Sequence, residues 1–208
     1  MKYQTHRISS LAAALCLPAI ALTSSIATAE DKATEKTEVA ADKEEATDQR
    51  IISLVLLQKS ARKLTHGEIA HAVEEGAGRK VAEDQVVTKE GYHLVPIGDD
   101  KYIVTDIDEP YFAEAAKLAD ELEDHHLSDA VKSASAWLSV DWPNTDDRKD
   151  LKHVYQHIGK TIAHLSNKET LAVYSPDLDA FALWTPAVRE TLEGDDPLAI
   201  FEKPAAKE

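Results

Sequence analysis

The stretch IISLVLLQ, residues 51–58, is almost wholly apolar and begins the folded part of this chain of 208 residues. A short continuous apolar run of this kind is typical of a strand covered on both faces, so it predicts a central strand of a sheet. Roughly 150 residues follow before the chain ends in a polar tail after Phe201, which is enough for one domain with one hydrophobic core. We therefore expect a single domain over residues 51–201.

The segments after this strand combine helices with antiparallel strands. Thr65 and Glu68 have the spacing of a capping box, so a helix should begin there and end at the pair Gly76 and Gly78. Strands are predicted at residues 85–88, 92–97, 102–106 and 136–142, and a hairpin at residues 171–184. Further helices are predicted between residues 110 and 135, over residues 150–165, and from Pro186 to Gly194.

The order of these elements predicts an α+β fold with a mostly antiparallel sheet and helices packed on one face. The order also has a rough symmetry. A strand, a helix and antiparallel strands lie between Ile51 and Asp106, and a strand, a helix, a hairpin and a helix lie between Ala136 and Gly194. This leaves open a domain built from two related strand–helix–strand–strand halves.

The N-terminus predicts export. Lys2 and Arg7 precede an uncharged apolar run, and residues 27–29, Ala-Thr-Ala, offer a small-x-small cleavage site. Residues 1–29 are therefore predicted to be a signal peptide that is cleaved near Ala29, which makes the mature chain periplasmic or secreted. The apolar run is too short to span a bilayer comfortably, so no integral membrane span is expected in the mature chain.

The composition of the mature chain excludes several functions. Residues 30–50 alternate charged residues with Ala and Thr and predict a disordered acidic tether, and residues 202–208 predict a frayed tail. Loss of Lys2 and Arg7 leaves 21 basic residues against 38 acidic ones, a net charge of −17, which disfavours nucleic acids and anionic bilayers. Cys16 is the only cysteine and leaves with the signal peptide, so no disulfide is expected.

The predicted helix over residues 150–165 carries three histidines, His153, His157 and His164. At about 100° per residue they share one stripe of the helix, and the core-facing apolar residues occupy another. His153 and His157 form an i, i+4 pair that could hold zinc. His164 lies about 10 Å further along the helix, too far to join the same ion.

A zinc ion would need another ligand, and His125, His126 or an aspartate could supply it. The alternative is a solvated histidine stripe, in which case no cofactor is bound. Asp106, Asp108 and Glu109 gather where a predicted strand gives way to a helix. They could form a divalent-cation or acid–base site, or they could simply favour the helix N-terminus.

The other patterns give weaker signals. His66 and His71 flank Glu68 as in a zinc-protease helix, but they are five residues apart instead of four and point away from each other. Trp142, Trp184 and Tyr174 are candidates for an exposed contact surface on the helix-free face of the sheet. Core packing is the alternative role for each of these aromatic side chains.

The ordered motifs WLSVD (137–141), YQHIGK (155–160) and LAVYSP (171–176) resemble an uncharacterised bacterial domain family without an assigned function. The resemblance covers about residues 51–201. It implies a compact α+β module and transfers no catalytic residue.

Together these features favour an exported, acidic module that binds a protein or a small-molecule ligand without catalysis. The alternative is a hydrolase or metal-dependent enzyme that uses His153 and His157 or the acids between Asp106 and Glu109. An enzyme requires a pocket in which an acid, a base or a metal converges from separate segments. A binding module requires instead an exposed aromatic surface or an open sheet edge.

Overall fold

The computed structural model describes residues 51–97, 100–143 and 151–202. The predicted signal peptide (1–29) and acidic tether (30–50) lie outside these residues, as does the predicted tail after Glu202. Among the helices described, none is long and apolar enough to cross a membrane.

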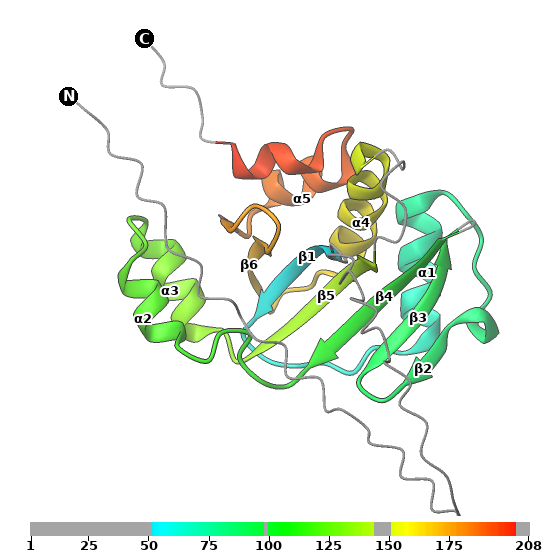
Figure 1. Cartoon of the computed structure of the whole chain (residues 1–208), viewed down its shortest axis with the longest axis horizontal. Coiled ribbons are helices and arrows are strands. Elements are labelled where there is room, and N and C mark those ends of the chain that lie inside the picture. Colours follow the sequence, from blue (N-terminus) through cyan, green and yellow to red (C-terminus); the bar gives the residue numbers. More distant parts are fainter. Residues whose placement is uncertain (1–50, 98–99, 144–150, 203–208) are drawn as a thin grey trace, which may run out of the picture. The chain divides into compact units, whose positions relative to one another are not determined.

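The described residues form one antiparallel sheet of seven strands in the order β2-β3-β4-β5-β1-β6-β7 (Figure 1). The strands are β1 (Ile51–Gln58), β2 (Val87–Lys89), β3 (Tyr92–Ile97), β4 (Asp100–Ile107), β5 (Ala136–Pro143), β6 (Thr170–Ser175) and β7 (Ala180–Leu183). The prediction for residues 51–58 is confirmed, because β1 lies between β5 and β6 and only its first residue, Ile51, is exposed.

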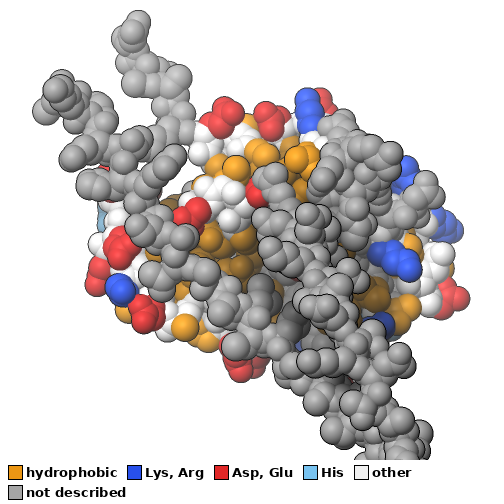
Figure 2. All heavy atoms as spheres, in the orientation of Figure 1, with side chains coloured by type: hydrophobic (Ala, Val, Ile, Leu, Met, Phe, Trp, Pro, Cys, Tyr) orange, Lys and Arg blue, Asp and Glu red, His pale blue; other side chains and the backbone are white. Residues whose placement is uncertain are grey.

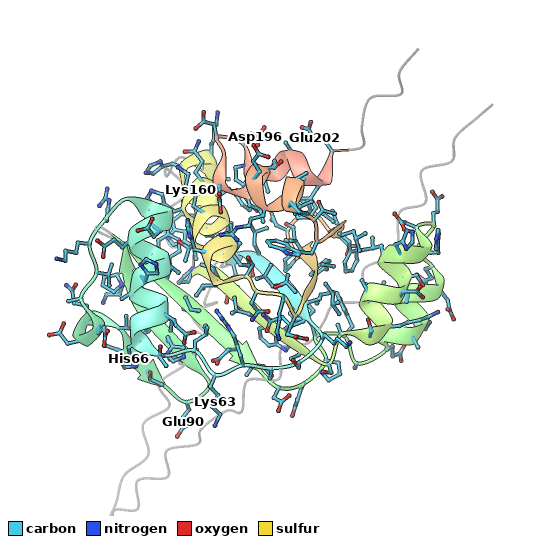
Figure 3. All side chains as sticks on the ribbon, turned by 180° about the vertical axis from the view of Figure 1, so that it is seen from behind. Lys63, His66, Glu90, Lys160, Asp196 and Glu202 are labelled. Carbon is cyan, nitrogen blue, oxygen red and sulfur yellow. The ribbon has the colours of Figure 1, made fainter. Side chains whose placement is uncertain are left out.

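Five α-helices pack against this sheet, which confirms the α+β class. They are α1 (His66–Ala77), α2 (Ala115–Asp120), α3 (His125–Ser133), α4 (Leu151–Leu165) and α5 (Pro186–Glu193), with 3₁₀ turns η1 (Glu83–Gln85) and η2 (Pro197–Phe201). Seen from behind, α1 and α4 stand in front of the sheet (Figure 3). The helices α2 and α3 stand at one end of the opposite face (Figure 1).

The alternation of side chains along β1 explains the two helical layers. Ile52, Leu54 and Leu56 join the larger core under α1, α4 and α5, whereas Val55 and Leu57 join a smaller core under α2 and α3. The prediction that the helices pack on one face is correct for α1, α4 and α5. The α2–α3 pair packs instead on the other face, which was not predicted. On the part of that face that is visible beside the grey atoms, charged side chains lie mainly toward the rim and apolar ones nearer the middle (Figure 2).

The two suspected halves interlock in the sheet. The strands that open the halves, β1 and β5, pair with each other along their full length. Each then pairs on its other side with the other half, β1 with β6 and β5 with β4. The helices α1 and α4 pack against each other above them. The order of the elements along the chain differs between the two halves. In the first half β4 is the last strand, whereas in the second half β6 directly follows the helix α4.

Candidate functional site

Polar side chains gather on the helix-covered face of β2, β3 and β4. Thr88 on β2 lies directly opposite His93 on β3. A two-residue turn fixes this register, and its second residue, Gly91, has a φ of 80° that favours glycine. His93 lies opposite Val104 on β4, so Asp106, two residues further along, is its diagonal neighbour on the same face.

His66, at the N-terminus of α1, is the fourth polar side chain of this group. The side chain of Thr65 accepts a hydrogen bond from the N–H of Glu68, and the Glu68 carboxylate accepts one from the N–H of Thr65 at 2.8 Å. This predicted capping box makes His66 the first residue of the helix, at the end labelled in Figure 3. The ring of His66 lies 5.9 Å from the ring of His93, between centroids.

These side chains form a continuous series of polar contacts, which we call the His–Thr–His–Asp chain. Nε2 of His66 lies 2.5 Å from Oγ1 of Thr88, and Oγ1 lies 2.9 Å from Nδ1 of His93. Nε2 of His93 lies 3.5 Å from Oδ1 of Asp106. The other carboxylate oxygen of Asp106 accepts a hydrogen bond from the N–H of Leu64 at 2.9 Å.

The arrangement can polarise a hydroxyl group. Thr88 is exposed, whereas the side chains of His93 and Asp106 are only 9% and 16% exposed. When His93 carries its proton on Nε2, it faces Asp106 with that proton and Nδ1 can accept the proton of Thr88. An acid, an imidazole and a hydroxyl in this order are the groups that general-base activation of a hydroxyl needs.

The acids predicted to act together are separated by the structure. Asp106 faces His93 between the sheet and α1. Asp108 and Glu109 follow the end of β4 and are exposed to solvent. The reason is the alternation of a strand, which turns Asp106 to the covered face, and the end of pairing after Ile107.

Sequence reasoning missed His93 and Thr88. A signal for His93 exists, because it alternates with Val95 and Ile97 on the buried face of its strand. A short turn between two strands would then have placed Thr88 across from it. The contribution of α1 has no comparable signal, because it depends on how the helix packs over the sheet.

The histidine pair of α4 has the predicted geometry. The rings of His153 and His157 lie 4.2 Å apart, between centroids. Burial, followed by the charges of His153, Arg79 and Lys160, lowers the pKa of His157 from 6.5 to about 4. The His157 imidazole is therefore neutral at pH 7, as a metal ligand must be, but the charges of Arg79 and Lys160, which disfavour its protonation, would oppose a bound cation as well.

The suggested further ligands for zinc do not reach this pair. His125 and His126 begin α3, which packs on the opposite face of the sheet from α4. Across the ranges 51–97, 100–143 and 151–202, no group of three or more His, Cys, Asp or Glu side chains could hold a metal ion. The zinc site at His153 and His157 stays a prediction with two ligands.

The three aromatic residues proposed as a contact surface are not brought together. Trp142 is 3% exposed in the core under the large helical layer, and Tyr174 is 8% exposed in the core on the other face. Both strands are covered at these positions, so neither ring can form an exposed surface. Trp184 is half-buried and contacts the larger core. Trp137 and Trp142 face opposite sides of β5, as their spacing predicted.

Two cavities that are open to solvent lie away from the His–Thr–His–Asp chain, and the second is shallow. One, of about 330 Å³, lies between the start of α4 and η2 and is lined by Leu151, Lys152, Tyr155, Asp177, Asp196, Pro197 and Leu198. The other, of about 370 Å³, lies between α3 and the ends of β6 and β7 and is lined by His126, Asp129, Ala130, Ser133, Thr170, Leu171, Leu183 and Trp184. We call the second the α3–β7 cavity.

No protein-family model matches this chain, and neither does any curated protein or solved structure with which it was compared. The resemblance to an uncharacterised bacterial α+β family therefore stays a prediction.

Proposed function

We propose that the domain is a binding module for an extended, positively charged segment of a partner protein. We also propose that the chain is exported and loses residues 1–29, as its N-terminal pattern predicts. The observation that supports the binding role is the α3–β7 cavity at the end of an edge strand. In this mode the partner backbone pairs with the edge strand and one partner side chain enters the cavity.

The edge strand β7 directs some of its backbone N–H and C=O groups away from the sheet. The N–H of Trp184 donates to the carbonyl of Leu171 at 2.9 Å, so this pair is a hydrogen-bonded one. Hydrogen-bonded and non-bonded pairs alternate along antiparallel strands. Phe181 and Leu183 therefore direct their N–H and C=O groups away from β6, and no strand of the described residues pairs with that side.

The two edges of the sheet differ in how they are protected. The opposite edge, β2, has only three residues and includes Lys89, a charge that discourages pairing with another strand. The sequence of β7 is Ala-Phe-Ala-Leu, with neither a charged residue nor a proline. An apolar, uncharged edge is the one that a partner strand can extend.

The α3–β7 cavity indicates the chemistry of the partner side chain. Leu171, Leu183 and Trp184 give it apolar walls, which suit an aliphatic stem. Asp129 is exposed at the cavity on the side of α3, where it can pair with a cationic tip. A lysine or arginine combines these two properties, because its stem is apolar and its end is charged.

The charge of the chain also selects between possible occupants. A second copy could pair with β7 as well, but each copy carries a net charge of −15 before any processing. Like charges oppose association of two copies and favour a basic partner. We therefore assign the edge to a basic segment of another protein.

Selection from a displayed library of random peptides tests this function directly. Enriched sequences should alternate apolar residues with Lys or Arg, and their amide contacts should appear as NMR shifts at Phe181, Ala182 and Leu183. Titration calorimetry with one enriched synthetic peptide should give a Kd that Asp129→Lys raises by about tenfold or more. Glu75→Lys makes the same charge change on an exposed position of α1 and should leave the Kd unchanged.

Three outcomes would contradict the proposal. The first is a library that yields no binder. The second is a binder whose affinity responds equally to Asp129→Lys and to Glu75→Lys, which would indicate attraction to the whole acidic surface. The third is concentration-dependent dimerisation through β7 in analytical ultracentrifugation, which would assign the edge to a second copy.

A further inference from the structure

The His–Thr–His–Asp chain is built differently from a simple bridge between strands. Its hydroxyl group belongs to Thr88, which is an exposed residue, and its imidazole base, His93, is buried. The acid behind the base, Asp106, is itself held by the backbone N–H of Leu64 at 2.9 Å. A bridge between strands needs a donor and an acceptor only, whereas a fixed acid behind the base orients the imidazole.

We propose that this chain is a hydrolytic site for carboxylic esters, with Thr88 as the nucleophile and His93 as the general base. Asp106, whose Oδ1 lies 3.5 Å from Nε2 of His93, is the positioning residue that favours the tautomer with the proton on Nε2 and leaves Nδ1 as an acceptor, 2.9 Å from Oγ1 of Thr88. His66 contacts Oγ1 from its other side at 2.5 Å. A donated N–H from His66 leaves the Thr88 proton directed at His93.

The reaction needs no further reagent than water. Oγ1 of Thr88 forms a bond to the ester carbonyl carbon while its proton moves to Nδ1 of His93. The bond from that carbon to the alcohol oxygen then breaks, and the alcohol leaves with the proton. Water attacks the acyl–threonine carbon, gives a proton to Nδ1, and the carboxylic acid departs as Oγ1 regains that proton from His93.

The position of the site favours reactive esters over amides. Thr88 lies on an edge strand and lines neither of the cavities described above. An open site provides little binding energy from remote parts of a substrate, and such energy is what difficult bond cleavage requires. Esters with good leaving groups need less of it, so they are the expected substrate class.

Covalent labelling with a biotinylated fluorophosphonate tests the nucleophile on the intact purified protein. Mass spectrometry should find one adduct, on the peptide that contains Thr88. Thr88→Val, which keeps the shape and removes the hydroxyl, should abolish labelling, and Thr88→Ser should retain it. His93→Gln should slow labelling about 100-fold or more. Thr191→Val removes another threonine hydroxyl, on α5, and should change nothing.

Asp106→Asn separates positioning from structural support. An asparagine amide can donate to Nε2 of His93, which moves the imidazole proton to Nδ1 and blocks acceptance from Thr88. Labelling should fall about 100-fold, and its increase with pH should disappear, while the melting temperature stays close to that of Thr88→Ser. Hydrolysis of p-nitrophenyl acetate, corrected for the Thr88→Val rate, should follow the same order.

The alternative is that the four residues only tie α1 to the sheet. In that case the wild-type protein stays unlabelled, and Thr88→Val lowers the melting temperature without any change in ester hydrolysis. That result overturns the proposal. So does an adduct on any residue other than Thr88, or labelling at Thr88 that is equally fast in His93→Gln. None of these outcomes bears on the β7 edge, which the peptide selection tests separately.

Discussion

Asp141 on β5 lies directly opposite Ser53 on β1, and its carboxylate accepts hydrogen bonds from the hydroxyls of Ser53 and Ser139. All three face away from the large helical layer. Burial raises the pKa of Asp141, although the two hydroxyl hydrogen bonds lower it. Burial also raises the pKa of the Tyr111 hydroxyl, and the charge of Asp141 adds to that shift. The sheet therefore holds this acid where its neutral form is favoured.

Asp141→Asn should stabilise the protein at neutral pH. Because the folded-state pKa of Asp141 is raised, the folded protein holds this proton more tightly than the unfolded chain does. The stability that the neutral acid contributes is complete below the ordinary pKa of 3.8 and is lost as pH rises through the raised value. Urea unfolding at pH 7.5 should give a higher free energy of unfolding for Asp141→Asn than for wild type.

Asp108→Asn is the matched control, because Asp108 is exposed and changes the charge by the same amount. It should leave the free energy of unfolding within about 0.5 kcal/mol of wild type both at pH 7.5 and at pH 3.5. The gain of Asp141→Asn should vanish near pH 3.5, where residue 141 is neutral in both the wild type and the variant. A gain that persists there would mean that the hydrogen bonds, and not the charge, account for it.

His157→Gln should make the protein less sensitive to acid. The pKa of His157 is lowered from 6.5 to about 4, chiefly by burial, so the folded protein resists a proton that the unfolded chain accepts. Its contribution to stability is complete above pH 6.5 and is lost as pH falls to about 4. Partial exposure to solvent screens the charges, so the loss across this window should be about 1–2 kcal/mol.

Thermal unfolding at pH 7.5, 5.5 and 4.5 measures this dependence. The difference in melting temperature between wild type and His157→Gln should shrink or reverse as the pH falls. His71→Gln replaces an exposed histidine on α1 and should follow the wild-type curve. Identical pH curves for wild type and His157→Gln would show that this imidazole does not limit stability in acid.

Local rules predicted the elements of this fold well. The capping box of Thr65 and Glu68 and the stop at Gly78, which has a φ of 63°, are both present because they depend on residues close in sequence. Gly76, also predicted to end this helix, lies inside α1. The apolar run of residues 51–58 likewise predicted correctly that β1 is a central strand of the sheet. The second helical layer could not be predicted in this way. Its position depends on which of the two apolar faces of β1 and β6 the short helices reach.

The candidate site shows the same limit. Asp106 was predicted to act, but with its neighbours in sequence, Asp108 and Glu109. Its actual partners come from β2, β3 and α1, and they are set by strand register and by helix packing. For Trp142 a local rule was enough to predict part of the result. The alternation of side chains along a strand predicted that Trp142 and Trp137 face opposite sides of β5. Which of the two faces would lie under α4 was a tertiary property.

Phe112→Ala should loosen α2 and α3 from the sheet. The ring of Phe112 lies 5.1 Å from that of Tyr174 and 5.6 Å from that of Phe181, between centroids. It thus attaches the segment before α2 to β6 and β7. Truncation of a partly buried phenylalanine should lower the free energy of unfolding by about 2 kcal/mol. Hydrogen exchange should accelerate in α2 and α3 more than in β1.

Leu178→Ala is the control for this truncation, because Leu178 is an exposed apolar residue of the β6–β7 turn, 46% accessible. It should change the free energy of unfolding by less than about 0.5 kcal/mol. Equal acceleration of exchange in β1 and in α3 by Phe112→Ala would mean that the α2–α3 layer unfolds together with the whole domain.

Gly76→Ala should force α1 and α4 apart. A Cβ atom at Gly76 would lie 2.6 Å from the backbone N of Thr161 and 2.9 Å from its Cα, closer than such atoms approach in proteins. Backbone atoms cannot swing away as a side-chain tip does, so one helix must shift. Overpacking should cost more than the roughly 1 kcal/mol that alanine gains over glycine in a helix, giving a net loss of about 2 kcal/mol.

Gly78→Ala separates this clash from backbone strain, because a Cβ there meets no atom within 4 Å and only the φ of 63° opposes it. It should cost about 1 kcal/mol and leave hydrogen exchange in α4 unchanged. Gly76→Ala should accelerate exchange in α4, and an equal effect of the two substitutions on α4 would contradict close packing as the reason for glycine at position 76.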